Sequence, residues 1–125
     1  MPLRWRLVIN EGHYTTKALI DTTSTANFIK KGMLDKLGIK YKIHPKDSPF
    51  YKPNVLGYTN LELSFRYKGE DRLVYGSDDT DFEVVEEPKA DLVLGLQWLW
   101  LRETKIDILK GGIWIYDNFV LFVKK

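Results

Sequence analysis

The residue whose position most clearly suggests chemistry is Asp21, which directly follows the apolar residues 18–20. A run of Thr and Ser residues comes next, and the apolar pair Phe28 and Ile29 follows that run. A carboxylate in this place would lie at the rigid end of a strand, where backbone N–H groups of the next turn can hold it. The stretch therefore favours two interpretations: an aspartate that works as an acid or base, or one that merely caps the following turn.

The sequence offers little support for other kinds of catalytic or metal site. His13 and His44 lie far apart and cysteine is absent, so neither a zinc site nor a disulfide framework is expected. Ser24 has no base nearby in the sequence that would activate it as a nucleophile. Gly111 and Gly112 lack the Lys-Ser/Thr ending of a phosphate-binding loop, so we interpret them as a hairpin turn. We expect no metal and no cofactor.

Length and composition indicate one globular domain that covers residues 1–125. A chain of 125 residues, of which 44% are hydrophobic, can bury one core but hardly two. No apolar run approaches the roughly 18 residues that span a membrane, and the first residues lack the apolar stretch of a signal peptide. The absence of cysteine suits a reducing compartment. We therefore expect an intracellular protein, in the cytoplasm or the nucleus, that does not contact a membrane.

The net charge of +2 hides an asymmetry between the two parts of the chain. Residues 1–68 carry 12 Lys and Arg against 5 Asp and Glu, whereas residues 69–125 carry 7 against 12. A basic half of this kind can bind nucleic acid when its charges are clustered. Here they are scattered, so ordinary surface charge is the favoured interpretation and a nucleic-acid partner is not expected.

The apolar pattern predicts a mostly β domain with about eight to ten short strands and one or two helices. The clearest strand is residues 60–67, where apolar and polar residues alternate. Turns are predicted at residues 11–14 and 68–71, and a turn or a bulge that interrupts the strand at residues 76–81. The other predicted strands cover residues 5–10, 17–20, 73–75, 82–85, 91–95, 106–108, 113–116 and 119–123.

Two short helices and one long irregular segment complete the predicted elements. Residues 28–37 are predicted to form an amphipathic helix that Gly38 ends, and residues 96–103 a second helix. Residues 41–58 contain three prolines with aromatic residues between them, so we expect a long, exposed and irregular hairpin there.

Two motifs in this order resemble the signatures of the retropepsin-like aspartic proteases of retroviruses, Ty3/gypsy-type retrotransposons and their domesticated relatives. The first signature is an apolar run, then Asp-Thr/Ser-Gly-Ala/Ser, and residues 18–24 match it except at Thr23. The second is an apolar strand that ends in Gly, followed by a short helix with Trp-Leu, and residues 92–99 match it. The residues that carry this second motif are Leu94, Gly95 and Trp98.

The resemblance implies an all-β, retropepsin-like acid-protease barrel with one lobe per chain, which works as a symmetric homodimer on a polypeptide. Each chain would supply one Asp21, the two carboxylates would share a proton, and Thr22 would interlock the two loops across the dimer axis. Residues 41–58 would be the mobile flap over the substrate, with Lys46, Asp47 and Ser48 at its tip. The subunits would meet through the terminal strands, residues 5–10 and Phe119, Val120, Leu121, Phe122 and Val123.

The sequence departs from this family at both functional elements. Thr23 stands where the family has Gly, and a β-branched residue fits poorly if φ is positive there. At negative φ its methyl and hydroxyl groups would crowd the catalytic water. The flap tip also lacks the family's Gly. We therefore predict a dimerising or peptide-binding pseudo-protease whose catalysis is weakened or lost. The alternative is an active aspartic endopeptidase that tolerates Thr23 and processes a Gag-Pol-like polyprotein of a retroelement.

Overall fold

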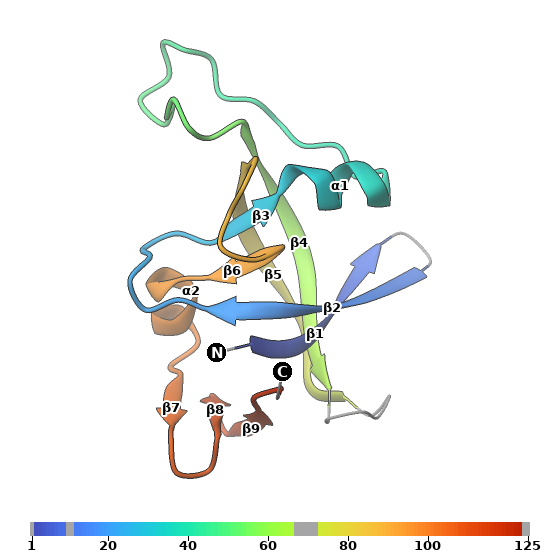
Figure 1. The fold of residues 1–125 in the computed structure, drawn as a ribbon, viewed down its shortest axis with the longest axis vertical. Coiled ribbons are helices and arrows are strands. Elements are labelled where there is room, and N and C mark those ends of the chain that lie inside the picture. The colour runs from blue at the N-terminus through green and yellow to red at the C-terminus, as the bar shows by residue number, and fades with distance from the viewer. Residues whose placement is uncertain (1, 10–11, 67–72, 124–125) are drawn as a thin grey trace.

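A computed structural model describes residues 2–9, 12–66 and 73–123, and strands make up most of its regular structure (Figure 1). The expectation of a mostly β protein with two short helices is confirmed. The two helices are α1 (Lys31–Leu37) and α2 (Leu96–Leu101). The strands are β1 (Pro2–Ile9), β2 (Gly12–Ile20), β3 (Phe28–Lys30), β4 (Gly57–Arg66), β5 (Leu73–Val85), β6 (Leu92–Leu94), β7 (Lys105–Asp107), β8 (Gly112–Ile115) and β9 (Asn118–Leu121).

The first six strands close a barrel in the order β1-β2-β6-β3-β5-β4, in which β4 pairs with β1. Strands β2 and β6 run parallel, with Ile20 opposite Leu94. Because parallel strands end at the same edge of a sheet, the residues that follow them become neighbours. Asp21 and Gly95, which are far apart in the sequence, therefore meet at one end of the barrel.

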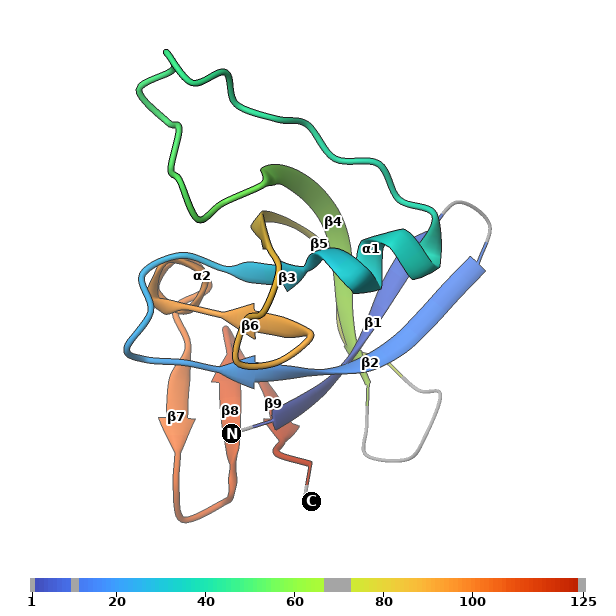
Figure 2. The same ribbon diagram turned by 45° about the horizontal axis from the view of Figure 1, so that its top comes forward.

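A second, smaller sheet lies beside the barrel and contains β7, β8 and β9 (Figure 2). Helix α2 connects β6 of the barrel to this sheet, so the two parts share one apolar core. Trp98 of α2 and Phe65 of β4 are fully buried and pack with their ring centroids 5.7 Å apart. Ile113 of β8 and Val120 of β9 are buried in the same cluster.

The predicted first helix starts too early, because residues 28–30 form strand β3. This short strand lies between β5 and β6 and pairs with both. Its backbone N–H and C=O groups are thus bonded to neighbouring strands, and a helix from Phe28 would have left both neighbours without a partner. Apolar periodicity over three residues cannot distinguish a buried strand from the first turn of a helix. The second helix also ends earlier than predicted, at Leu101.

The structure also tests the predicted turn before β2 and the predicted irregularity within β5. Residues 12–14 belong to β2 rather than to a turn, because Gly12 already pairs with Ile9. Strand β5 continues through residues 76–81, where a turn or a bulge was predicted, so the turn is wrong and the bulge is confirmed. Register shifts against β4 show that the irregularity there is a β-bulge, which keeps the strand continuous. Asn10 and Glu11 of the predicted strand and turn, and the predicted turn at residues 68–71, lie outside the described residues.

The segment between α1 and β4 is long and irregular, and it extends away from the barrel (Figures 1 and 2). Its arms join near the barrel through a bridge between Lys42 and Tyr58. At this point a Cβ atom on Gly57 would lie 2.2 Å from the carbonyl oxygen of Lys42, so the close approach requires glycine. The segment ends at Leu56, whose N–H donates to the carbonyl oxygen of Val84 over 2.8 Å. This hydrogen bond ties the end of the long segment to β5 of the barrel.

Candidate functional site

The loop that carries Asp21 is fastened to β6 and to the start of α2 by backbone hydrogen bonds. The N–H of Asp21 donates to the carbonyl oxygen of Leu94 over 3.0 Å. The N–H groups of Leu96 and Gln97 donate to the carbonyl oxygens of Ser24 and Thr25 over 2.8 and 3.0 Å. These donors belong to the first turn of α2 and would otherwise have no partner within the helix. The second motif therefore supports the loop of the first.

Gly95 is the point at which this loop crosses the second motif. An ideal Cβ atom on Gly95 would lie 2.3 Å from the carbonyl oxygen of Ala26 and 2.6 Å from that of Ser24. The φ angle of Gly95 is −98°, so space rather than backbone conformation demands glycine here. Any side chain would push the loop, and Asp21 with it, away from the barrel.

Asn27 closes the loop and links it to a third strand. Its side chain is only 6% exposed. The N–H of Gly95 donates to Asn27 Oδ1 over 2.9 Å, and Asn27 Nδ2 donates to the carbonyl oxygen of Asp81 in β5 over 3.1 Å. One buried amide thus joins the Asp21 loop, the Gly95 turn and β5. The sequence analysis did not assign this role to Asn27.

Asn27→Ala is expected to lower the free energy of unfolding by about 2–3 kcal/mol, because it leaves the buried N–H of Gly95 and the partly buried carbonyl of Asp81 without partners. Urea denaturation monitored by tryptophan fluorescence measures the change. Asn60→Ala is the matched control, because Asn60 is exposed and donates to the carboxylate of Asp81 over 2.8 Å. Asn60→Ala should lower the free energy of unfolding by less than about 1 kcal/mol. Equal costs for the two variants would contradict the buried linking role of Asn27.

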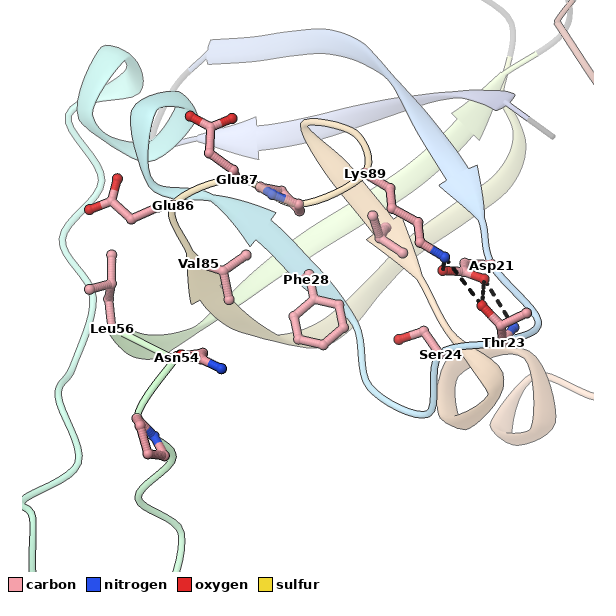
Figure 3. A pocket seen from close by; sticks show the side chains of 13 residues that line it. Asp21, Thr23, Ser24, Phe28, Asn54, Leu56, Val85, Glu86, Glu87 and Lys89 are labelled. Atoms are coloured by element: carbon pink, nitrogen blue, oxygen red, sulfur yellow. Dashed lines mark hydrogen bonds and ion pairs between the residues drawn. The ribbon is translucent and has the colours of Figure 1, made fainter.

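The carboxylate of Asp21 is 9% exposed, and both of its oxygens have bonding partners (Figure 3). The N–H of Thr23 donates to Oδ1 over 3.0 Å, and the hydroxyl of Thr23 donates to the same oxygen over 2.5 Å. The ammonium of Lys89, from the connection between β5 and β6, lies 2.9 Å from Oδ2. Lys89 also donates to Thr23 Oγ1 over 3.3 Å. These three residues form a compact charged cluster.

The cluster holds Asp21 in its ionised form. The hydroxyl of Thr23 contributes most, followed by Lys89 and then the N–H of Thr23, and together they lower the pKa of Asp21 from 3.8 to about 2. Hydrogen bonds and a cation that meet the charged form favour that form over the protonated one. Asp21 is therefore an anion throughout the neutral and mildly acidic range. A carboxylate of such low basicity is also a poor base for activating the hydroxyl of Thr23 as a nucleophile.

Thr23 is accommodated without backbone strain. Among the described residues other than glycine, positive φ angles occur at Glu103 and Tyr116, so Thr23 keeps an ordinary conformation. The sequence raised two obstacles to catalysis at Thr23: a strained φ angle and crowding by its side chain. The strained φ angle is absent. The crowding remains, because the Thr23 side chain borders the cavity in front of Asp21 and its hydroxyl donates a hydrogen bond to the carboxylate.

A cavity of about 700 Å³ opens in front of this cluster. Its size lies in the range of sites that bind small molecules or short peptide segments. The cavity is lined by Asp21, Thr23, Ser24, Phe28, Pro53, Asn54, Leu56, Val85, Glu86, Glu87, Pro88, Lys89 and Val93. The long segment contributes Pro53, Asn54 and Leu56, from its end next to β4 (Figure 3). Lys46, Asp47 and Ser48 are not among the lining residues, and their role at a flap tip stays a prediction.

Thr22 is not among the residues that line this cavity, and it borders another hollow of about 500 Å³. The other residues of this hollow come from α2 and the chain that follows it: Leu96, Leu99, Trp100, Thr104 and Ile106. Trp100 is 80% exposed and Leu96 is 45% exposed. The surface next to the Asp21 loop is thus apolar and uncovered.

The remaining residues of the sequence analysis fall into two groups. Leu94 and Trp98 are fully buried, so they support the site from within the core. The segment from Phe119 to Val123 is more mixed, because Val120 and Val123 are buried within their own chain and Leu121 is 45% exposed. The role of this segment in a dimer stays a prediction.

Lys89 belongs to this charged cluster, although no sequence motif pointed to it. It stands in an acidic stretch, 68 residues away from Asp21, and no local pattern connects the two. A signal was present only in hindsight: Lys89 lies in the connection just before β6, the strand of the second motif, whose end meets Asp21.

Residues 2–9, 12–66 and 73–123 contain neither a metal-binding cluster nor a membrane-spanning helix. No group of three or more His, Asp or Glu side chains in these ranges is arranged to hold a metal ion. No helix there is long and apolar enough to cross a membrane.

Comparisons with known proteins identify the fold. No protein-family model matches the sequence, and no curated protein sequence matches it. Among solved structures, the chain is similar to the retroviral protease-like domain of Ddi1 from Leishmania major. The two share a TM-score of 0.73 over 99% of this chain and 97% of that one, at 19% sequence identity. The chain therefore has a retropepsin-like fold, as its two motifs predicted.

Proposed function

We propose that this retropepsin-like domain dimerises and binds polypeptide without cleaving it. The observation that carries the proposal is the bonding of Asp21, whose two oxygens are held by Thr23 and Lys89. Two features support the proposal. Thr23 replaces the glycine of the family motif, and Lys89, which lies outside that motif, places a cation at the carboxylate.

The chemistry of paired aspartates explains why this bonding opposes catalysis. Two carboxylates about 3 Å apart share one proton, so that the charged member activates a water and the protonated member polarises the peptide carbonyl. Within the single chain, Thr23 and Lys89 lower the pKa of Asp21 to about 2, so they favour its ionised form over the protonated one. Its two oxygens also accept hydrogen bonds from the hydroxyl of Thr23 and the ammonium of Lys89, which would compete with a water for the same oxygens.

The cavity supports the binding part of the proposal. Its floor contains the apolar residues Phe28, Leu56, Val85 and Val93. Such a floor accepts apolar side chains of a ligand, while polar groups at the rim orient its backbone. A groove between barrel strands and the long segment suits an extended peptide.

The dimeric part of the proposal has two candidate surfaces. One is the apolar hollow beside Thr22, which α2 lines with Leu96 and Trp100. An uncovered apolar area of this kind is typical of a protein-protein interface, and its place next to the loop would bring two Asp21 residues together. The other surface is the terminal segment from Phe119 to Val123, where Leu121 is the most exposed apolar side chain.

An active aspartic endopeptidase that processes a Gag-Pol-like polyprotein is the second candidate. The framework favours it, because Asp21 and Gly95 keep the positions that the two motifs require and the cavity opens directly in front of the carboxylate. The two candidates differ in whether peptide bonds are broken, and a peptide library distinguishes them.

Peptides from a random library are expected to bind but not to be cleaved between about pH 4 and 7. Leu56→Glu places a charge in the cavity floor and should weaken peptide binding at least about tenfold. Phe50→Glu is the matched control, because Phe50 lies on the same segment, is 71% exposed and does not line the cavity. Fluorescence anisotropy measures binding, and mass spectrometry detects cleavage. Cleavage that disappears in Asp21→Ala would instead establish the active endopeptidase.

A further inference from the structure

The Asp21 site faces a problem of charge if two copies of it meet. This inference rests on the dimer proposed above. Two carboxylates in contact repel each other, and the cost falls when one of them takes up a proton or when a cation lies beside each of them. The first solution makes assembly depend on pH, whereas the second does not.

In the described structure a cation, the ammonium of Lys89, lies beside the Asp21 carboxylate. Lys89 Nζ lies 2.9 Å from Asp21 Oδ2, although the Lys89 side chain is 64% exposed and has other directions open to it. The same ammonium donates to Thr23 Oγ1, so two bonds hold it over the carboxylate. It comes from the connection between β5 and β6 rather than from the Asp21 loop, and the barrel brings the two together (Figure 3).

Among the described residues, Asp21 is the carboxylate with which Lys89 forms an ion pair. From the Asp21 loop the facing group is the neutral hydroxyl of Thr23. From β3 and β6 the side chains that line the cavity are Phe28 and Val93, which are uncharged. Glu86 and Glu87 of the β5–β6 connection line the same cavity, and Glu87 lies 3.7 Å from Lys30.

We propose that Lys89 is the countercharge of a two-Asp21 centre, in which the ammonium of each protomer replaces the proton that the paired carboxylates would otherwise share. Lys89 is thus a positioning residue for the dimer. The dimer forms without taking up a proton, and both Asp21 carboxylates stay ionised in it.

The proposal predicts how the dissociation constant of the dimer depends on pH. For the wild-type chain it should stay constant between about pH 5 and 8, because monomer and dimer hold equal numbers of protons in this centre. In Lys89→Met the paired carboxylates must bind one proton that the separate monomers do not hold. A rise in pH then favours the monomers, and the dissociation constant should increase about tenfold per pH unit while the pair keeps that proton.

Sedimentation equilibrium of the whole chain at constant ionic strength measures these constants. Lys89→Arg keeps the cation and should behave as the wild type. Lys30→Met is the matched control, because it removes the same charge from a lysine that pairs with Glu87. Adding Asp21→Asn to Lys89→Met removes the repulsion and should abolish the pH dependence.

The outcomes separate this inference from the proposed function. A Lys89→Met dimer whose dissociation constant does not change with pH would overturn the countercharge role and leave the dimer standing. A pH dependence in the wild type would show a shared proton, which contradicts the inference and favours the active endopeptidase. A wild-type chain that stays monomeric would overturn the proposed dimer and the countercharge together.

Discussion

Replacing Thr23 by Gly and Lys89 by Met in one variant is expected to raise the pKa of Asp21 from about 2 toward 3.8. The two substitutions remove the hydroxyl and the ammonium, which are the two largest causes of the low pKa. The N–H of residue 23 can still donate to the carboxylate, so part of the lowering should remain. The ¹³C chemical shift of the side-chain carboxyl carbon, followed against pH, measures the change.

The same variant should change the acid stability of the protein. The folded-state pKa of Asp21 lies below its ordinary value, so its bonding stabilises the wild type above about pH 4, and this contribution is lost as the pH falls toward 2. The unfolding free energy of the variant should therefore vary less over that range. Thr22→Gly with Lys30→Met is the control, because it makes the same two replacements at positions that do not bond Asp21. An unchanged Asp21 titration in the test variant would refute the assigned bonding.

Gly95→Ala is expected to destabilise the fold by about 3 kcal/mol or more. The added methyl group would lie 2.3 and 2.6 Å from two carbonyl oxygens of the Asp21 loop. Neither oxygen can move freely, because the Ser24 carbonyl accepts a hydrogen bond from α2 and Asn27 holds the end of the loop. The loop must therefore leave the barrel edge. Chemical denaturation measures the loss, and peptide binding should weaken with it.

Gly32→Ala provides the comparison for this substitution. Gly32 lies in α1, and the nearest side-chain atom to a Cβ atom added there would be Lys30 Cε, at 3.9 Å. Alanine in a helix interior is about 0.5–1 kcal/mol more favourable than glycine, so this variant should be slightly stabilised. If both variants had the same small effect, the close crossing at Gly95 would not exist in solution.

Local patterns predicted the parts of the fold that are made by neighbours in the sequence. The alternation of residues 60–67 identified β4, and Gly38 with its φ of 69° ends α1 as expected. The same patterns failed where a short segment is held by distant partners. Phe28–Lys30 became a strand because β5 and β6 bond it from both sides, and neither strand is near it in the sequence.

The site divides in the same way. The motifs identified Asp21 and Gly95, and the missing glycine at position 23 marked a departure from the family. The direction of the Thr23 hydroxyl depends on the conformation of the loop, and the arrival of Lys89 depends on the closure of the barrel. An ion pair between residues 68 positions apart leaves no periodic trace in either segment.

The amino-acid sequence by itself determined that Asp21 follows an apolar strand. It also determined that Gly95 ends a second apolar strand, which can pack beside the first. Both are consequences of short-range chemistry, since strand patterning and steric need for glycine are properties of a few adjacent residues. Only the tertiary structure decided how far the pKa of that acid lies below its ordinary value. The pKa of a carboxyl group depends on what lies within a few ångströms in space, and folding alone brings Lys89 and the Thr23 hydroxyl to Asp21.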